Sequence, residues 1–149
     1  MRRFLIYLDV CTLCRPFDDQ SFLRIRLETD AVNLIMSKIH DRQLQLAVSP
    51  VHFVEIKAIS DSLERMELIS IVERYGMSME VDTIVARKRA EELVRLGFGI
   101  ADVAHVAFAE AGHAKFITCD DKLLKKCQKN NIYVWCGSPV RFCSEEDLR

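Results

Sequence analysis

The sequence has 149 residues, of which 50% are hydrophobic and 29% are charged, and its formal net charge at pH 7 is −1. This length and composition match one globular domain with a sizeable core, and they exclude a disordered or fibrous chain. The near-zero charge provides no overall attraction for nucleic acid, so nucleic-acid binding would require a local basic patch. We therefore expect a single domain over residues 1–149.

The first ten residues, "MRRFLIYLDV", combine Arg2 and Arg3 with an apolar run that ends at Asp9. The run is too short for the hydrophobic region of an export signal, and no small-residue cleavage site follows it. No segment approaches the ~18 apolar residues that a membrane helix requires. The expected location is the cytoplasm, with no membrane association.

Six cysteines lie at positions 11, 14, 119, 127, 136 and 143. Reduced thiols are the expectation for a cytoplasmic chain. Cys11 and Cys14 have the C-x-x-C spacing of redox and zinc sites, so thiol redox chemistry is one alternative function. A zinc site would need a second ligand pair, and Cys136 and Cys143 are too far apart in sequence to match the usual spacing.

The first half of the chain alternates predicted strands and helices. The apolar run at 4–10 predicts a buried strand, and residues 11–20 predict a loop. Apolar residues recurring at threes and fours predict a helix at 21–40, which a second strand at 45–49 follows. Ser49 and Pro50 provide an N-cap and a first helical residue for a helix through 51–60. A further amphipathic helix covers 62–76 and ends at Gly76.

The second half repeats the alternation. A short strand at 77–82 precedes a helix at 83–97, and a strongly apolar helix follows at 100–111, ending at Gly112. The remaining predicted elements are a strand at 114–120, a helix at 121–130 and a strand at 131–137. Strands separated by helices form βαβ units, so we expect an α/β fold: a three-layer α/β/α sandwich with a central parallel sheet and Rossmann-like topology. No G-x-G-x-x-G or P-loop motif indicates a nucleotide.

Four acidic residues fall where ligands bind in such folds. Asp9 ends the first strand, Glu55 lies in the helix after the second strand, Asp102 lies in the first turn of the apolar helix, and Asp120 ends the strand 114–120. Parallel sheets bind ligands beyond the carboxyl ends of their strands, so all four should lie at one edge of the sheet. Four carboxylates there repel one another, at about 4 kcal/mol for a pair ~4 Å apart at an effective dielectric near 20. Oxygen ligands without clustered His or Cys favour Mg²⁺ or Mn²⁺ as the compensating ion.

Each acid taken alone also has an ordinary structural interpretation. Asp102 could be a partner of the helix dipole, Asp120 an N-cap, and Glu55 a surface residue beside Lys57. His105, one turn after Asp102, is interpreted as an interior imidazole with satisfied hydrogen bonds. The four acids together, at matching strand ends, favour the metal site.

These segments resemble a protein family. "YLDVCTLC", "SPVHFVEI", "GFGIADVAHVAFAEAG" and "FITCDDKLLKK", in this order, resemble the PIN-domain proteins, in particular VapC-type toxin ribonucleases and their stand-alone relatives. The resemblance implies a PIN-like fold and a Mg²⁺- or Mn²⁺-dependent endoribonuclease with an acidic quartet at Asp9, Glu55, Asp102 and Asp120. It also implies a supporting hydroxyl at Thr118, with Asp121 as a further candidate ligand. Cys11 occupies a place where many members have Asn.

Further expectations concern partners. Arg15, Lys122, Lys125 and Lys126 are the candidate RNA-binding cations. The resemblance implies a homodimer and an antitoxin that inserts a segment into the acidic groove, and the helices within 21–75 could bind either partner. The alternative to catalysis is a non-catalytic PIN-like interaction module. A phosphatase of the haloacid dehalogenase type is excluded because it needs Asp-x-Asp, whereas Cys11 follows Asp9 at that spacing.

Overall fold

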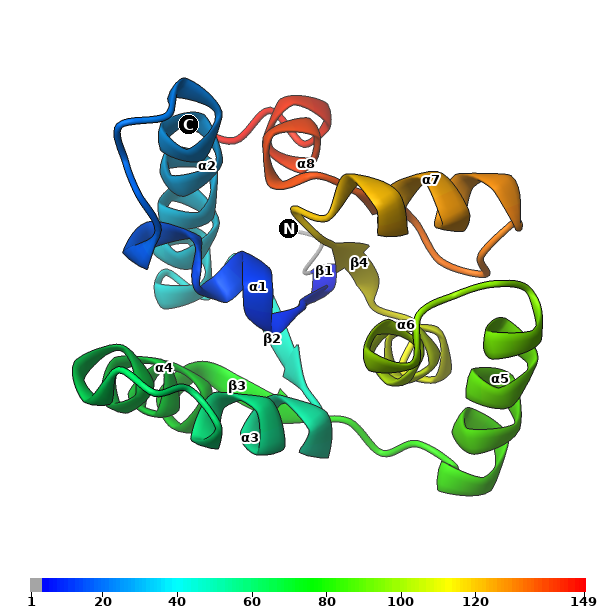
Figure 1. Ribbon diagram of the computed structural model, residues 1–149. Helices are drawn as coiled ribbons and strands as arrows, with labels where there is room; N and C mark the ends of the chain where they lie inside the picture. Colours follow the sequence, from blue (N-terminus) through cyan, green and yellow to red (C-terminus); the bar gives the residue numbers. More distant parts are fainter. Residues whose placement is uncertain (1–3) are drawn as a thin grey trace.

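A parallel sheet forms the centre of the computed structural model, which describes residues 4–149. The order of its five strands within those residues is β3-β2-β1-β4-β5, and every neighbouring pair is parallel (Figure 1). The strands are β1 (Phe4–Leu8), β2 (Leu44–Val48), β3 (Gly76–Ser78), β4 (Lys115–Ile117) and β5 (Cys136–Gly137). Arg2 and Arg3, considered above as part of an export signal, lie outside the described residues.

Helices cover both faces of this sheet. They are α1 (Val10–Leu13), the 3₁₀ helix η1 (Arg15–Phe17), α2 (Leu23–His40), α3 (Pro50–Lys57), α4 (Ser62–Tyr75), α5 (Thr83–Arg95), α6 (Ile100–Ala111), α7 (Asp121–Lys129) and α8 (Pro139–Glu145). Residues of α2, α3, α4 and α8 pack in one buried cluster, and residues of α5, α6 and α7 pack in the other. The predicted three-layer α/β/α sandwich is confirmed.

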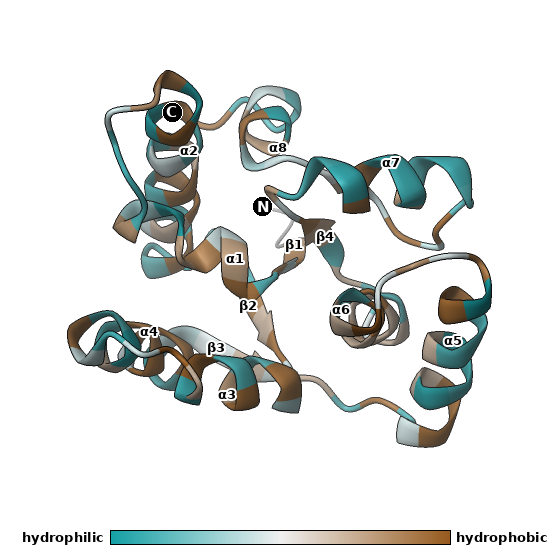
Figure 2. Ribbon diagram, in the orientation of Figure 1, coloured by the Kyte–Doolittle hydropathy of each residue, from teal (hydrophilic) through white to brown (hydrophobic). Residues whose placement is uncertain are grey.

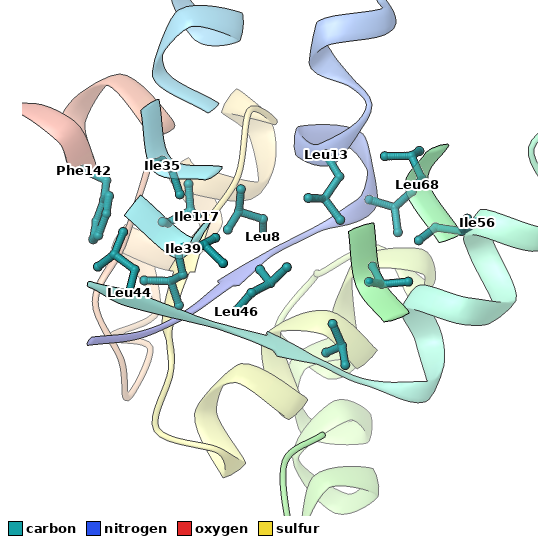
Figure 3. Packing of buried hydrophobic residues seen from close by; sticks show 14 residues of the cluster. Leu8, Leu13, Ile35, Ile39, Leu44, Leu46, Ile56, Leu68, Ile117 and Phe142 are labelled. Atoms are coloured by element: carbon teal, nitrogen blue, oxygen red, sulfur yellow. The ribbon is translucent and has the colours of Figure 1, made fainter. Parts of the chain in front are cut away.

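Alternation along the strands assigns side chains to the two clusters. Ile6 and Leu8 pack on the face covered by α2 and α4, whereas Tyr7 between them packs on the face covered by α6. Figure 3 shows Leu8 and Leu46 among the aliphatic side chains of the first cluster.

Figure 2 shows brown along the central strands and teal over much of α5 and α7, so the outer helices expose their polar faces. No helix of the described part is long and apolar enough to cross a membrane.

Several local predictions differ from the structure: the strand expected at 77–82, for example, is Gly76–Ser78. Residues 11–20 are not a loop throughout, because Asp9 caps the short helix α1 and Pro16 favours the 3₁₀ turn η1. The strand expected at 131–137 is reduced to Cys136–Gly137. Helix α8 was not predicted, although Ser138 caps it and Pro139 begins it, the same Ser-Pro signal that begins α3 at Ser49 and Pro50.

The connections create a switch point in the sheet. From β1 the chain adds β2 and then β3 on one side, and it then crosses back through α5 and α6 to add β4 on the other side of β1. The carboxyl ends of β1 and β4 therefore flank the crevice where open α/β sheets bind their ligands.

A buried ion pair joins α5 to α6 at the outer layer. Arg89 Nε donates to Glu110 Oε1 at 2.7 Å and Arg89 Nη2 donates to Glu110 Oε2 at 3.2 Å. Glu110 also accepts the backbone N–H of Tyr133, whose ring lies 4.1 Å from the guanidinium of Arg89. The Glu110 side chain is only 3% exposed, so its charge depends on these partners.

Replacing Glu110 by Gln should therefore destabilise the fold. The change leaves the buried Arg89 charge poorly compensated, and the expected loss is about 3 kcal/mol of the free energy of unfolding, measured by urea denaturation. The control is Arg87→Ala, which removes an exposed i,i+4 pair with Glu91 on the same helix and should have little effect. Equal losses in the two variants would contradict this account of the α5–α6 contact.

Candidate metal-binding and catalytic site

The sheet topology directs four acidic residues to its carboxyl edge. Asp9 follows β1 directly, Asp120 lies three residues after β4, Glu55 lies on α3 after β2, and Asp102 lies in the first turn of α6. Figure 1 shows α1, α3, α6 and α7 arranged around the ends of the central strands. The structure thus places all four on the elements that surround the switch point.

Asp9 is a buried carboxylate with hydroxyl partners on both oxygens. The residue is 4% exposed. Its Oδ1 accepts from Thr12 Oγ1 at 2.5 Å, from the Thr12 backbone N–H at 3.3 Å and from Cys11 Sγ at 3.3 Å, and its Oδ2 accepts from Thr118 Oγ1 at 2.6 Å. These donors compensate the loss of water around the charge.

The hydroxyl of Thr118 connects two of the acids. It donates to Asp9 and accepts the backbone N–H of Asp120 at 3.1 Å, and the residue is fully buried. The Asp120 carboxylate in turn caps α7 by accepting the N–H groups of Lys122 and Leu123. The interpretation of Asp120 as an N-cap is therefore confirmed. The Thr118 hydroxyl also links its backbone to the Asp9 carboxylate at the end of β4.

Asp102 differs from the other three acids in its hydrogen bonding. No hydrogen bond reaches its carboxylate from any other side chain or backbone group of residues 4–149. Partial burial raises its pKa above the ordinary value, and the charges of Asp120 and Asp9 raise it further, against weaker opposing effects of His105 and Lys126. Gly99 leaves room for this carboxylate, since a Cβ there would lie 3.3 Å from Asp102 Oδ2. Three acids of the predicted quartet therefore lie within electrostatic reach of one another.

Glu55 contacts a buried imidazole. Its Oε1 lies 2.6 Å from His105 Nε2, and His105 Nδ1 lies 2.5 Å from the Tyr7 hydroxyl. The hydrogen bond between Glu55 and His105 is the main cause that lowers the pKa of Glu55 below its ordinary value. His105 is 3% exposed, so the expectation of a satisfied interior imidazole is met by the structure.

The donor chemistry suits a hard cation, but the ligands are not gathered around one point. Carboxylate oxygens of Asp9, Asp102 and Asp120 are the type of ligand that Mg²⁺ and Mn²⁺ prefer. Within residues 4–149, however, no group of three or more His, Cys, Asp or Glu side chains is arranged closely enough to hold an ion. An ion would have to draw these carboxylates together, and its positive charge would then offset both the burial of Asp102 and its repulsion by Asp120 and Asp9.

Two predicted site residues are engaged elsewhere. Arg15 forms ion pairs with Asp18 at 2.9 Å and with Glu28 at 3.0 Å. Asp121 accepts hydrogen bonds from both terminal nitrogens of Arg24, at 2.6 and 2.8 Å, and this ion pair lowers the pKa of Asp121. Their charges are thus compensated within the chain. This weakens the prediction that Arg15 contacts RNA and the prediction that Asp121 binds a metal ion.

The predicted lysines all lie on α7. Lys122 and Lys125 are exposed, and Lys126 is half-buried on the side where its charge opposes the raised pKa of Asp102. Helix α7 begins at the Asp120 cap, so the three lysines lie on the helix that starts at the acidic edge.

Sequence reasoning missed several side chains that support the acids. Thr12 could have been found, because a hydroxyl three residues after a capping Asp lies at the helix start. Tyr7 had no such local signal, since its hydroxyl contacts Ser49 and His105, 42 and 98 positions away, and the contact of His52 with the Leu8 carbonyl spans 44 positions.

Thr118→Val should remove a partner of a buried charge while preserving the shape of the side chain. We expect the free energy of unfolding to fall by about 2 kcal/mol, because Asp9 Oδ2 and the Asp120 N–H both lose the hydroxyl. The control is Thr29→Val on α2. It removes a single hydrogen bond, from the Thr29 hydroxyl to the Arg15 carbonyl, and should lower the free energy of unfolding by about 1 kcal/mol. A Thr118→Val variant no less stable than the control would show that this hydroxyl does not stabilise the Asp9 charge.

His52 should remain neutral through the physiological range. Burial lowers its pKa from 6.5 to about 4, against its hydrogen bond to the Leu8 carbonyl. Because the unfolded chain then takes up the proton first, this contribution to stability is complete above pH 6.5 and is lost as the pH falls towards 4, by up to about 3 kcal/mol. The pKa can be measured by NMR titration of the ring, and His52→Gln should flatten the dependence of unfolding on pH. A midpoint near 6.5 would contradict the prediction.

Comparison with known proteins supports the fold. No family model and no curated protein sequence matches this chain. Among solved structures, it is similar to FitAB bound to the IR36 DNA fragment, with 13% identity, a TM-score of 0.55, and coverage of 91% of this chain and 95% of the other. It is also similar to FitAcB from Neisseria gonorrhoeae, with 13% identity, a TM-score of 0.51 and coverage of 90% and 97%. The chain therefore shares the fold of those structures, a three-layer α/β/α sandwich around a parallel sheet that is consistent with the PIN fold.

Proposed function

We propose that this protein is a metal-dependent endoribonuclease and the toxin of a toxin–antitoxin pair. The observation that carries the proposal is the convergence of Asp9, Asp102 and Asp120 on the switch point of the sheet, where the charges of Asp120 and Asp9 add to burial in raising the pKa of Asp102. The fold agrees with it, because FitB in the similar structures is a PIN-domain toxin of the VapC type.

The proposed ligands are the three aspartates, with Glu55 at the side of the site. A bound Mg²⁺ or Mn²⁺ would activate water and stabilise negative charge on the scissile phosphate. Thr12 and Thr118 hold the Asp9 carboxylate in one orientation, and the α7 backbone holds Asp120. Glu55, ionised and 34% exposed, is the group available to orient the attacking water or to bind a second ion through the substrate.

RNA would approach along α7. Lys122 and Lys125 are exposed there, and they can attract phosphates that the acidic edge repels. A hollow of about 400 Å³ lies beside Asp120, lined partly by Phe22 and Arg24. The exposed Phe22 ring offers a stacking surface for an unpaired base.

An antitoxin and a second copy of the chain are the proposed protein partners. Exposed apolar side chains occur on α2, α3 and α4, within the helices expected to bind a partner: Phe22, Leu23, Leu27, Val54, Leu63 and Met66. Such residues are the usual anchors of a protein interface. The resemblance to toxin–antitoxin proteins also favours a cytoplasmic location.

A second candidate is a non-catalytic PIN-like interaction module. The observation that favours it is the spacing of the acids, which are not gathered into a three-ligand group anywhere in the part of the chain described. This candidate predicts that the purified protein cleaves no RNA with Mg²⁺ or Mn²⁺. The thiol redox alternative is weakened, because burial raises the pKa of Cys11 and raises that of Cys14 to about 12, which disfavours the reactive thiolate.

Asp102→Asn should abolish cleavage without destabilising the fold. With Mn²⁺ and a mixed RNA substrate, we expect the rate to fall at least ~100-fold, because the variant loses a charged ligand. Since the folded pKa of Asp102 is raised, its charge opposes folding at neutral pH, and the neutral amide should leave stability equal to or above that of the wild type.

The matched control is Asp30→Asn, an exposed aspartate on α2. It should preserve the cleavage rate, and EDTA should abolish cleavage by both the wild type and this control. Undiminished cleavage by Asp102→Asn would remove this residue from the site, and cleavage that persists in EDTA would remove the metal from the mechanism.

A further inference from the structure

A continuous chain of buried polar contacts runs from Glu55 to the end of β1. Glu55 contacts His105, His105 contacts the Tyr7 hydroxyl at 2.5 Å, and that hydroxyl lies 2.7 Å from Ser49 Oγ. The chain continues through Ser49 to His52, whose Nε2 lies 2.7 Å from the Leu8 carbonyl oxygen. We call this set the Glu55–Leu8 chain. It joins α3, α6 and the central strands beneath the acidic edge.

The protons in this chain can be assigned from one end to the other. The Leu8 carbonyl only accepts, so His52 Nε2–H donates to it, and His52 Nδ1 then accepts the Ser49 N–H at 3.0 Å. At the other end the Glu55 carboxylate only accepts, so His105 Nε2–H donates to it. With one proton on the His105 ring, the Tyr7 hydroxyl donates to His105 Nδ1 and accepts from the Ser49 hydroxyl. Every donor then has an acceptor, and each ring has one tautomer.

This order fixes the orientation of His105 more strongly than packing alone. The ring is 3% exposed, and its Nδ1 is held by the Tyr7 hydroxyl, which Ser49 holds in turn. Glu55 is the only member of the Glu55–Leu8 chain with a substantially exposed side chain. The buried members therefore hold one partly exposed carboxylate in a set direction, on the helix that follows β2 at the carboxyl edge of the sheet.

We propose that His105 is a positioning residue that holds Glu55 for catalysis, with Tyr7 holding His105 in turn. This inference rests on the proposed nuclease function, and it adds a role for a residue whose contacts would otherwise serve only the core. Partners that orient a catalytic or metal-binding side chain typically contribute 10- to 100-fold to activity when they are removed.

Two isosteric variants separate the two sides of the ring. In His105→Gln the amide nitrogen can occupy the place of Nε2 and donate to Glu55, but the contact with Tyr7 is lost. In His105→Asn the amide can occupy the place of Nδ1 and contact Tyr7, but the contact with Glu55 is lost. If His105 acts through Glu55, kcat for RNA cleavage with Mn²⁺ should fall ~10- to 100-fold in His105→Asn and less than ~10-fold in His105→Gln.

The decisive measurement is a double-mutant cycle with Glu55→Gln. In the Glu55→Gln background, His105→Asn should lower kcat no further, because the residue through which it acts is already lost. A residue that only supports the core would lower kcat by the same factor in both backgrounds. Urea unfolding of all variants confirms that each is folded under the conditions of the assay.

The outcomes distinguish this inference from the function on which it rests. A cycle with no further loss, together with the better activity of His105→Gln, supports the positioning role. An active wild type with additive losses, or with His105→Asn more active than His105→Gln, overturns the positioning role and leaves the nuclease intact. A wild type that cleaves no RNA with Mg²⁺ or Mn²⁺ overturns the nuclease proposal, and the positioning role is overturned with it.

Discussion

The buried carboxylate of Asp9 is the constraint on which the organisation of the site depends. It ends the central strand β1, it is 4% exposed, and its charge is tolerated because Thr12 and Thr118 donate to its two oxygens. Thr12 belongs to α1 and Thr118 follows β4, so the same hydrogen bonds join both sides of the switch point. The contacts that allow this charge to be buried therefore also join β1 and β4 just beyond the last pair of their ladder, Leu8 and Ile117, at the edge of the crevice.

The opposite side of β1 is tied by a second polar system. His52 donates to the carbonyl of Leu8, the residue before Asp9, and the chain through Tyr7 and His105 reaches Glu55. Buried polar groups are tolerated when all of them are satisfied, and each buried side-chain nitrogen and oxygen of residues 4–149 has a partner. The end of β1 is thus held by hydrogen bonds from both layers of helices, which gives a site at this edge a rigid base.

Asp102 differs from its neighbours because its charge has no direct partner. Its raised pKa reflects burial and the nearby charges of Asp120 and Asp9, so the ionised form costs folding stability that His105 and Lys126 recover only in part. Polar groups left in such a state are typical of functional sites, where a ligand supplies the missing compensation. The contrast with Arg89 and Glu110, which compensate each other fully in the outer layer, separates a structural charge pair from a candidate ligand site.

Most of the order of the elements, and the placement of the four acids on elements at one edge of the sheet, could be predicted from the sequence, because periodicity and caps are encoded locally. The Ser-Pro cap at Ser49 illustrates this, and the same signal at Ser138 was available but unused. Only the tertiary structure decided which groups compensate which charges: Thr118 reaches Asp9 across 109 residues, and Tyr7 reaches His105 across 98. A hydrogen bond requires its donor–acceptor distance to be correct within a few tenths of an ångström. Between segments remote in sequence that distance is set by the tertiary packing, and no pattern within one segment specifies it.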